Sequence, residues 1–235
     1  IYHAALHILA EIGMRVNHDE GRELMLAAGC TQAGNGCVHV PRELVANALI
    51  HQDFFVTGAG PMVEVFADRM EITNPGEPLV AAERFLDTPP KSRNEALASL
   101  MRRIGICEER GSGVDKVVFQ TELFQLPAPL FEVKGESTRA VLFSHRPLAK
   151  MDREDRVRAC YLHACLKYVN REFLTNTSVR QRFGIDQENS ATASRLIKEA
   201  GEAGVISAAD EEAGKRFMKY VPWWVARKPA EGASS

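Results

Sequence analysis

The stretch that decides the fold of the first half of the chain is residues 63–76, VEVFADRMEITNPG. Apolar and polar residues alternate over residues 63–66 and again over 70–73, with a short break at 67–68. Alternation with a period of two is typical of half-buried strands, and two such runs around a short break predict a β-hairpin. Asn74-Pro75-Gly76 then ends the second strand, because proline lacks an N–H and glycine favours turns.

Helices and a second hairpin are predicted around this stretch. Apolar residues spaced three and four apart predict helices over residues 41–51, 95–104 and 113–121. A further hairpin is predicted from residues 131–133 and 139–143. Residues 41–147 are therefore expected to form one α+β domain, preceded by a short segment, residues 1–40, of two helices and a strand at 37–40.

The C-terminal part has a different order of elements. Helices are predicted over residues 152–169, 179–183 and 190–202, followed by strands at 205–206 and 217–221. Trp223 and Trp224 are expected to pack back on this core, and residues 226–235 are expected to be a disordered tail. Three helices followed by a hairpin are the order of a winged helix-turn-helix domain, which the sequence predicts over residues 151–225.

Composition indicates a folded globular chain. Of 235 residues, 45% are hydrophobic and 26% are charged, with a formal net charge of −2. No apolar run approaches the roughly 18 residues of a membrane span, and residues 1–16 do not resemble a signal peptide. The five cysteines form no tight framework, which favours a reducing cytoplasm over a disulfide scaffold.

The cysteines and histidines give weak candidates for chemistry. Cys160, His163 and Cys165 have a spacing that suggests metal, but Cys165 points away from the helical face of the other two. Two core thiols and a partly exposed histidine are the expected interpretation. His51 with Asp53 could form an acid–base pair, although capping of a helix end is the expected role.

A stronger candidate is a nucleotide site built from several short pieces. Glu43 and Asn47 lie one helical turn apart, where a carboxylate and an amide can hold a water and a hydrated Mg²⁺. Gly111-Ser112-Gly113 precede a helix, where backbone N–H groups and the positive helix end can approach phosphates. Each piece alone is more often a solvated helix face or an ordinary loop.

These pieces resemble a known family in order and spacing. Residues 42–54 (RELVANALIHQDF), 66–76 (FADRMEITNPG), Arg93-Asn94, 109–114 (ERGSGV) and 126–132 (LPAPLFE) are similar to the GHKL-type ATP-binding domain of RecG-like C-terminal and Schlafen-AlbA-type regulators. The resemblance covers roughly residues 42–145 and implies an α/β sandwich that binds ATP with Mg²⁺.

The resemblance also implies roles for individual residues. Glu43 would polarise an attacking water, and Asn47 would help to hold the metal. Asn74 and Gly76 would lie near adenine, and Gly111, Ser112 and Gly113 near the phosphates. The wider superfamily has an adenine-reading carboxylate where this chain has Asn74, which puts ATP turnover in doubt. No P-loop of the form G-x4-G-K-[ST] is present, so a helicase motor is not expected.

The predicted winged helix would contact DNA through the third helix and the wing. The residues expected to meet DNA are Arg180, Arg182, Thr192, Arg195, Lys198, Lys215 and Arg216. Residues 151–235 carry 14 Lys and Arg against 12 Asp and Glu, which permits such a contact without demanding it. The alternative is that the same module mediates protein contacts or dimerisation.

Residues 1–45 resemble a second, unrelated family. Residues 1–4 (IYHA), 10–16 (AEIGMRV), 27–29 (AAG) and 38–45 (VHVPRELV) look like the N-terminal segment of the trimethylamine methyltransferase family. That family needs a TIM barrel and a corrinoid partner, for which this chain has no room. The two resemblances overlap at residues 41–45, where the join is expected.

The sequence therefore predicts a cytoplasmic, ATP-binding and DNA-binding transcriptional regulator. The nucleotide would act as a conformational ligand with weak or absent hydrolysis, and a homodimer is compatible with the sequence. The alternatives are a non-enzymatic interaction protein with a degenerate nucleotide site, or a relic of a methyltransferase.

Overall fold

The computed structural model describes residues 14–15, 31–32, 37–39, 48–89, 91–104, 113–210, 212, 214 and 218–226. The chain divides into two compact units. The first comprises Ile1–Phe124 and Pro129–His145, and the second comprises Gln125–Ala128 and Arg146–Ser235. The chain therefore passes three times from one unit to the other.

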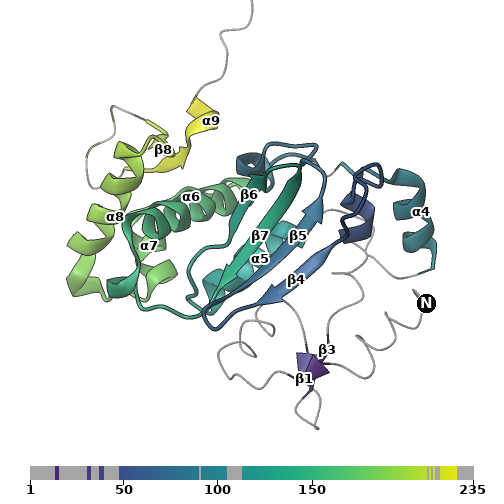
Figure 1. Cartoon of the computed structure of the whole chain (residues 1–235). Helices are drawn as coiled ribbons and strands as arrows, with labels where there is room; N and C mark the ends of the chain where they lie inside the picture. Colours follow the sequence, from purple (N-terminus) through teal and green to yellow (C-terminus); the bar gives the residue numbers. More distant parts are fainter. Residues whose placement is uncertain are drawn as a thin grey trace, which may run out of the picture. The chain divides into compact units, whose positions relative to one another are not determined.

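A four-stranded antiparallel sheet forms the centre of the first unit (Figure 1). Its strands are β4 (Met62–Val65), β5 (Arg69–Pro75), β6 (Leu130–Lys134) and β7 (Ser137–Phe143), in the order β4-β5-β7-β6. Both predicted hairpins are confirmed, with Val65 opposite Met70 in one and Lys134 opposite Ser137 in the other. Pairing of β5 with β7 joins the two hairpins into one sheet.

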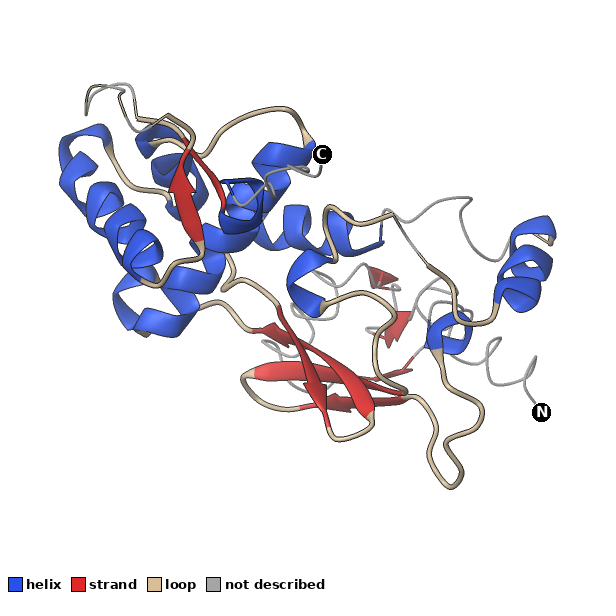
Figure 2. Ribbon diagram, turned by 90° about the horizontal axis from the view of Figure 1, so that it is seen from above, coloured by secondary structure: helices blue, strands red, loops and turns tan. Residues whose placement is uncertain are grey.

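One face of this sheet is apolar and covered. Met70 on β5 and Leu142 on β7 lie opposite each other, and Met70 is only 1% exposed. Helix α5 (Gly113–Leu123) lies alongside the sheet in both views, and its Val118 is buried (Figures 1 and 2). A predicted helix over 113–121 is thus confirmed, extended by two residues.

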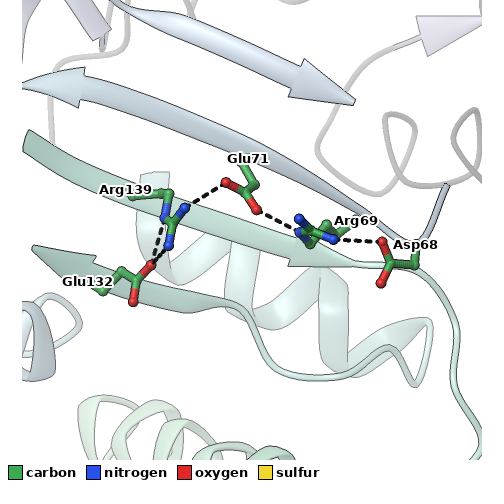
Figure 3. A network of polar contacts seen from close by, with 5 residues as sticks. All are labelled: Asp68, Arg69, Glu71, Glu132 and Arg139. Atoms are coloured by element: carbon green, nitrogen blue, oxygen red, sulfur yellow. Dashed lines mark hydrogen bonds and ion pairs between the residues drawn. The ribbon is translucent and has the colours of Figure 1, made fainter. Parts of the chain in front are cut away.

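The alternate positions of the same strands carry a ladder of charges (Figure 3). Glu71 accepts hydrogen bonds from Arg69 at 2.6 Å and from Arg139 at 2.8 Å, and Arg139 also pairs with Glu132. Asp68 extends the ladder through Arg69. The hydrogen bond from Arg69, supported by the charge of Arg139, lowers the pKa of the Glu71 carboxyl below its ordinary value.

Helix α4 (Glu95–Arg103) packs against the end of the helix predicted over 41–51, of which residues 48–51 are described as helical. Ile50, Ala98 and Met101 form the buried cluster between them. Three further short strands form a small sheet of their own, in the order β1-β3-β2. They are β1 (Met14–Arg15), β2 (Thr31–Gln32) and β3 (Cys37–His39), and β3 confirms the strand predicted at 37–40.

The second unit contains three helices and a two-stranded hairpin. Its elements are α6 (Arg153–Val169), α7 (Asn176–Phe183), α8 (Ser190–Glu202), β8 (Ile206–Ala208), β9 (Tyr220–Pro222) and the short α9 (Trp223–Ala226), with 3₁₀ turns at Leu148–Lys150 and Gln187–Asn189. Leu174, between α6 and α7, forms an isolated antiparallel bridge with Tyr220 of the hairpin.

Local hydrogen bonds explain where these helices begin and end. Asp152 caps α6 by accepting from Asp155 N–H at 2.8 Å, and Thr175 forms a capping box with Ser178 at the start of α7. Gly184 ends α7 in the left-handed conformation, with φ of 62°.

The aromatic residues after β9 pack back on the second unit, as predicted. Trp224 Nε1 donates to the Tyr161 hydroxyl at 3.3 Å, and the Trp224 ring meets Tyr168 edge-on. Helix α9 extends to Ala226, where the disordered tail was predicted to start, and the rest of that tail lies outside the described residues. The helices predicted within residues 1–36 lie outside them too.

Candidate functional site

Three segments of the first unit that the sequence singled out meet at one place: residues 48–53, 74–76 and 93–94. The amide of Asn94 donates to the carbonyls of Leu49, Ile50 and Gln52, at 2.8–3.2 Å. The last carbonyls of a helix have no partner within the helix, and this side chain satisfies them. Asn94 therefore fixes the end of the helix on which Glu43 and Asn47 are predicted to lie.

Asn74 also bonds to the same helix. Its Nδ2 donates to Ala48 O at 2.9 Å, and its Oδ1 is buried with no hydrogen-bond partner among the described residues. The amide nitrogen of Asn74, the residue predicted to lie near adenine, is thus used to hold the helix to β5. Any recognition of a base by Asn74 would rest on Oδ1.

An ion pair completes the junction, which is the place where residues 48–53, 74–76 and 93–94 meet. Arg93 Nη1 lies 3.1 Å from Asp53 Oδ2, and Arg93 Nη2 donates to Glu77 O. The other carboxylate oxygen of Asp53 accepts from Phe55 N–H at 2.9 Å, and Asp53 N–H donates to Pro75 O at 2.8 Å. Both oxygens of Asp53 are therefore occupied, which fits a structural role better than a general base.

Gly76 is the tightest point of the junction. Its φ is 105°, and a Cβ built there would lie 2.7 Å from Asp53 Cβ and 3.4 Å from Arg93 Nε. Its N–H donates to Glu136 O and its carbonyl accepts from Thr138 Oγ1, both at 2.8 Å. Glycine is needed at this position because the backbone conformation and the neighbouring side chains both exclude a Cβ.

A pocket of about 400 Å³ opens beside this glycine. It is lined by Asp53, Val56, Gly76, Glu77, Pro78, Leu79, Arg93 and Glu136. This volume lies within the range of small-molecule sites, and the aliphatic side chains suit the flat face of a base. Carboxylates outnumber the single arginine in the lining, so the pocket suits the base end of a nucleotide better than its phosphates.

Of the other residues predicted to bind the nucleotide or its metal, the structure describes only Gly113. Gly113 is the first residue of α5, as expected for a glycine that opens a helix. Glu43, Asn47, Gly111 and Ser112 lie outside the described residues. His51 follows Asn47 by four residues. Its burial, and to a smaller extent the positive charge of Arg93, lower the pKa of its imidazole below the ordinary value.

The second unit exposes a set of basic and small polar residues on α7 and α8, named here the face of α7 and α8, beside the acidic Glu199 and Glu202 of α8. The exposed or half-buried residues on this face are Thr177, Arg180, Gln181, Ser190, Ala191, Ser194, Arg195 and Lys198. Asn176, the first residue of α7, joins the two helices by donating to Ser190 O and to Ser194 Oγ, each at 2.9 Å. The opposite side of α8, with Ala193, Leu196, Ile197 and Ala200, is buried.

Each of the two acidic residues of α8 lies near a cation. Glu199 accepts from Arg156 of α6 at 2.9 and 3.2 Å, and Glu202 lies 3.6 Å from Lys198. Arg195 is exposed and donates to Thr192 Oγ1 at 3.1 Å. The face therefore offers cations and small hydroxyls, which are common contacts for a nucleic acid.

Arg182 was predicted from the sequence to contact DNA, but the structure buries it. It is 3% exposed, and its Nη2 donates to Leu126 O at 2.7 Å. The spacing already indicates this, because Arg182 follows Val179 by three residues and precedes Phe183, and both are buried. Lys215 and Arg216 of the predicted wing lie outside the described residues, whereas the ammonium nitrogen of Lys219 lies over the Phe173 ring, 4.9 Å from its centre.

The cysteines of α6 are core residues. Cys160 and Cys165 are both buried, and His163 is 4% exposed and not partly exposed as predicted. Within the described ranges, no group of three His, Cys, Asp or Glu side chains is placed to hold a metal ion. Across the same ranges, no helix combines the length and the apolarity that crossing a membrane requires.

Comparison with known proteins bears on the first unit. Residues 58–142, less than half of the chain, match the family described as "Putative ATP-dependent DNA helicase recG C-terminal". No curated protein matches the chain. The crystal structure of the DIP2311 protein from Corynebacterium diphtheriae matches with 22% identity and a TM-score of 0.42, covering 77% of this chain and 39% of that one. The segment from β4 to β7 thus carries an ATPase-like domain match.

Proposed function

We propose that this protein is a DNA-binding regulator whose first unit binds ATP as a conformational ligand. The observation that carries the proposal is the set of exposed and half-buried basic and hydroxyl residues on α7 and α8, in a chain whose residues 58–142 match an ATPase-like family. Neither the residues on α7 and α8 nor the family match alone defines a function. Together they suit a protein in which a bound nucleotide changes the affinity for nucleic acid.

The order of elements supports the DNA half of the proposal. Helices α6, α7 and α8, the Leu174–Tyr220 bridge and the β8–β9 hairpin follow the order of a winged helix. In such domains the third helix enters the major groove, which here would place Arg195 near base edges. Arg180 and Lys198, with Lys215 and Arg216 of the wing, would contact phosphates.

The junction beside Gly76 supports the nucleotide half. The pocket there would take the base, and the predicted glycine segment 111–113 at the start of α5 would take the phosphates. Mg²⁺ held by Asn47 would neutralise phosphate charge, and Glu43 would orient a water if hydrolysis occurs. With Asn74 in place of a carboxylate, binding with weak or absent turnover is the expected behaviour.

Measuring DNA affinity against salt tests the DNA half. Each phosphate contact contributes about 0.9 to the slope of log K against log salt, so four contacts predict a slope of about −4. Lys215→Ala should reduce this slope by nearly one on every sequence. Arg195→Ala should cost roughly 1–3 kcal/mol, mainly on the preferred site. Failure of a random duplex pool to yield any bound sequence at physiological salt would refute the proposal.

A second candidate is a non-enzymatic interaction protein. It is favoured by one observation: Asn74, predicted to lie near adenine, and its neighbours Asp53 and Arg93 form hydrogen bonds within the first unit, which leaves fewer of their polar atoms for a nucleotide. In this case the junction is structural and the face of α7 and α8 binds protein. Calorimetry with Mg-ATP separates the two candidates, since only the first predicts heat of binding that Gly113→Val removes.

A further inference from the structure

We infer that Thr177 and Asn176 are positioning residues that hold Arg180 ready for a DNA phosphate. The inference rests on the proposed DNA-binding function and deepens it. Arg180 Nε donates to Asn176 Oδ1 at 3.1 Å, and Arg180 Nη2 donates to Thr177 Oγ1 at 3.3 Å. Two of the three guanidinium nitrogens are therefore held by the first turn of the same helix.

The geometry follows from the direction of helical side chains. A long side chain in a helix leans toward the N-terminus, so Arg180 reaches back over the residues three and four positions before it. Neither bond uses Nη1, which carries two further N–H donors. The guanidinium is planar, so fixing two nitrogens also fixes the direction in which Nη1 donates.

Asn176 ties this arrangement to α8. While its Oδ1 accepts from Arg180, its Nδ2 donates to Ser190 O and Ser194 Oγ. One amide thus sets the position of Arg180 and holds the start of α8, the helix proposed to enter the major groove. The spacing between the phosphate contact and the base-reading helix is fixed by that shared side chain.

Holding Arg180 in advance should increase affinity without adding a contact. Ordering a flexible side chain on binding typically weakens binding by a factor of about two to ten, and a side chain already ordered avoids this loss. Lysine at position 180 would keep the charge but has all its donors on one nitrogen, so it offers no separate nitrogen that is held in place for a phosphate.

A double-mutant cycle on DNA affinity tests the inference with the full chain. Thr177→Val removes the hydroxyl acceptor while keeping the size, so it should weaken binding about two- to tenfold. The same substitution in an Arg180→Ala background should have no further effect. Thr177→Ser retains the hydroxyl and should bind as the wild type does. Thr177→Ser is therefore the matched control for the loss of the hydroxyl.

Each outcome of the cycle decides the inference. An equal loss from Thr177→Val in both backgrounds would show a role unconnected with Arg180 and overturn it. No loss in either background would overturn it as well, while wild-type binding of DNA keeps the proposed function standing. If the wild type binds no duplex, the proposed function fails and this inference fails with it. Asn176→Ala, compared in the same way, should lose more than Thr177→Val because it also releases α8.

Discussion

At the scale of single residues, side-chain amides and one glycine hold the first unit together at its predicted site. Asn94 satisfies three helix-end carbonyls and Asn74 a fourth. Each bond spans 26 to 45 residues of sequence. The sequence shows that Asn74 and Asn94 belong to a motif. It does not show their role, because the local sequence cannot indicate which distant carbonyl each amide will bond.

Gly76→Ala tests the junction at this scale. The substitution forces a Cβ into the left-handed region and against Asp53 Cβ, 2.7 Å away. The conformational penalty is about 1–2 kcal/mol, and the overlap should add about 1–3 kcal/mol to the loss of unfolding free energy. Urea unfolding measures this loss.

Gly58 provides the matched control, because its φ is also positive, at 78°, and a Cβ there meets nothing within 4 Å. Gly58→Ala should therefore cost only the conformational penalty. Equal losses for the two variants would show that Asp53 and Gly76 are not packed as described.

At the scale of elements, alternation in the sequence predicted both hairpins, and spacing predicted helices α4, α5, α6 and α8. The sheet order was not predictable, since β5 and β7 are separated by more than 60 residues and pair only in the folded chain. The charge ladder depends on that pairing. It brings Arg139 of β7 to Glu71 of β5, and no local pattern connects the two residues.

The ladder predicts how the stability of the first unit depends on pH. Because the pKa of Glu71 is lowered in the folded state, its stabilisation is present above about pH 4.5 and is lost as pH falls through the lower, folded value. Glu71→Gln should cost about 1–3 kcal/mol at neutral pH, since two arginines lose a charged acceptor. Between about pH 6 and pH 3 the variant should lose less stability than the wild type.

Glu64→Gln is the control for this series, because Glu64 lies directly opposite Glu71 and carries the same charge. Removing it should be neutral or slightly stabilising. Urea midpoints that fall in parallel for the wild type and Glu71→Gln would contradict the role given to the ladder.

At the scale of the whole molecule, each unit contains a segment that is separated in sequence from the rest of it. The first unit includes residues 129–145 and the second includes residues 125–128. Residues 125–128 belong to the second unit, where Arg182 donates to Leu126 O and Arg158 donates to Ala128 O. Leu126 and Ala128 are buried there. In the sequence this segment stands out only as part of the motif LPAPLFE, because a short proline-rich segment gives no sign of what it packs against.

A fragment of residues 146–235 should therefore be less stable than the second unit in the full chain. It lacks two carbonyl acceptors and the apolar side chains of the missing segment, which together predict a loss of about 2–5 kcal/mol. Urea unfolding of the fragment, compared with the corresponding transition of the full chain, measures the difference. Equal stability would show that residues 125–128 are dispensable.

The central claim is that ATP in the first unit changes DNA binding by the second, and the most direct test is DNA affinity with and without Mg-ATP. A labelled duplex selected from a random pool would be titrated with the full chain and followed by fluorescence anisotropy. Coupling between two sites is typically about 5- to 150-fold, so Mg-ATP should change the wild-type affinity at least about fivefold. Gly113→Val should bind the duplex as the nucleotide-free wild type does and show no response. The same wild-type affinity in both conditions would contradict the account.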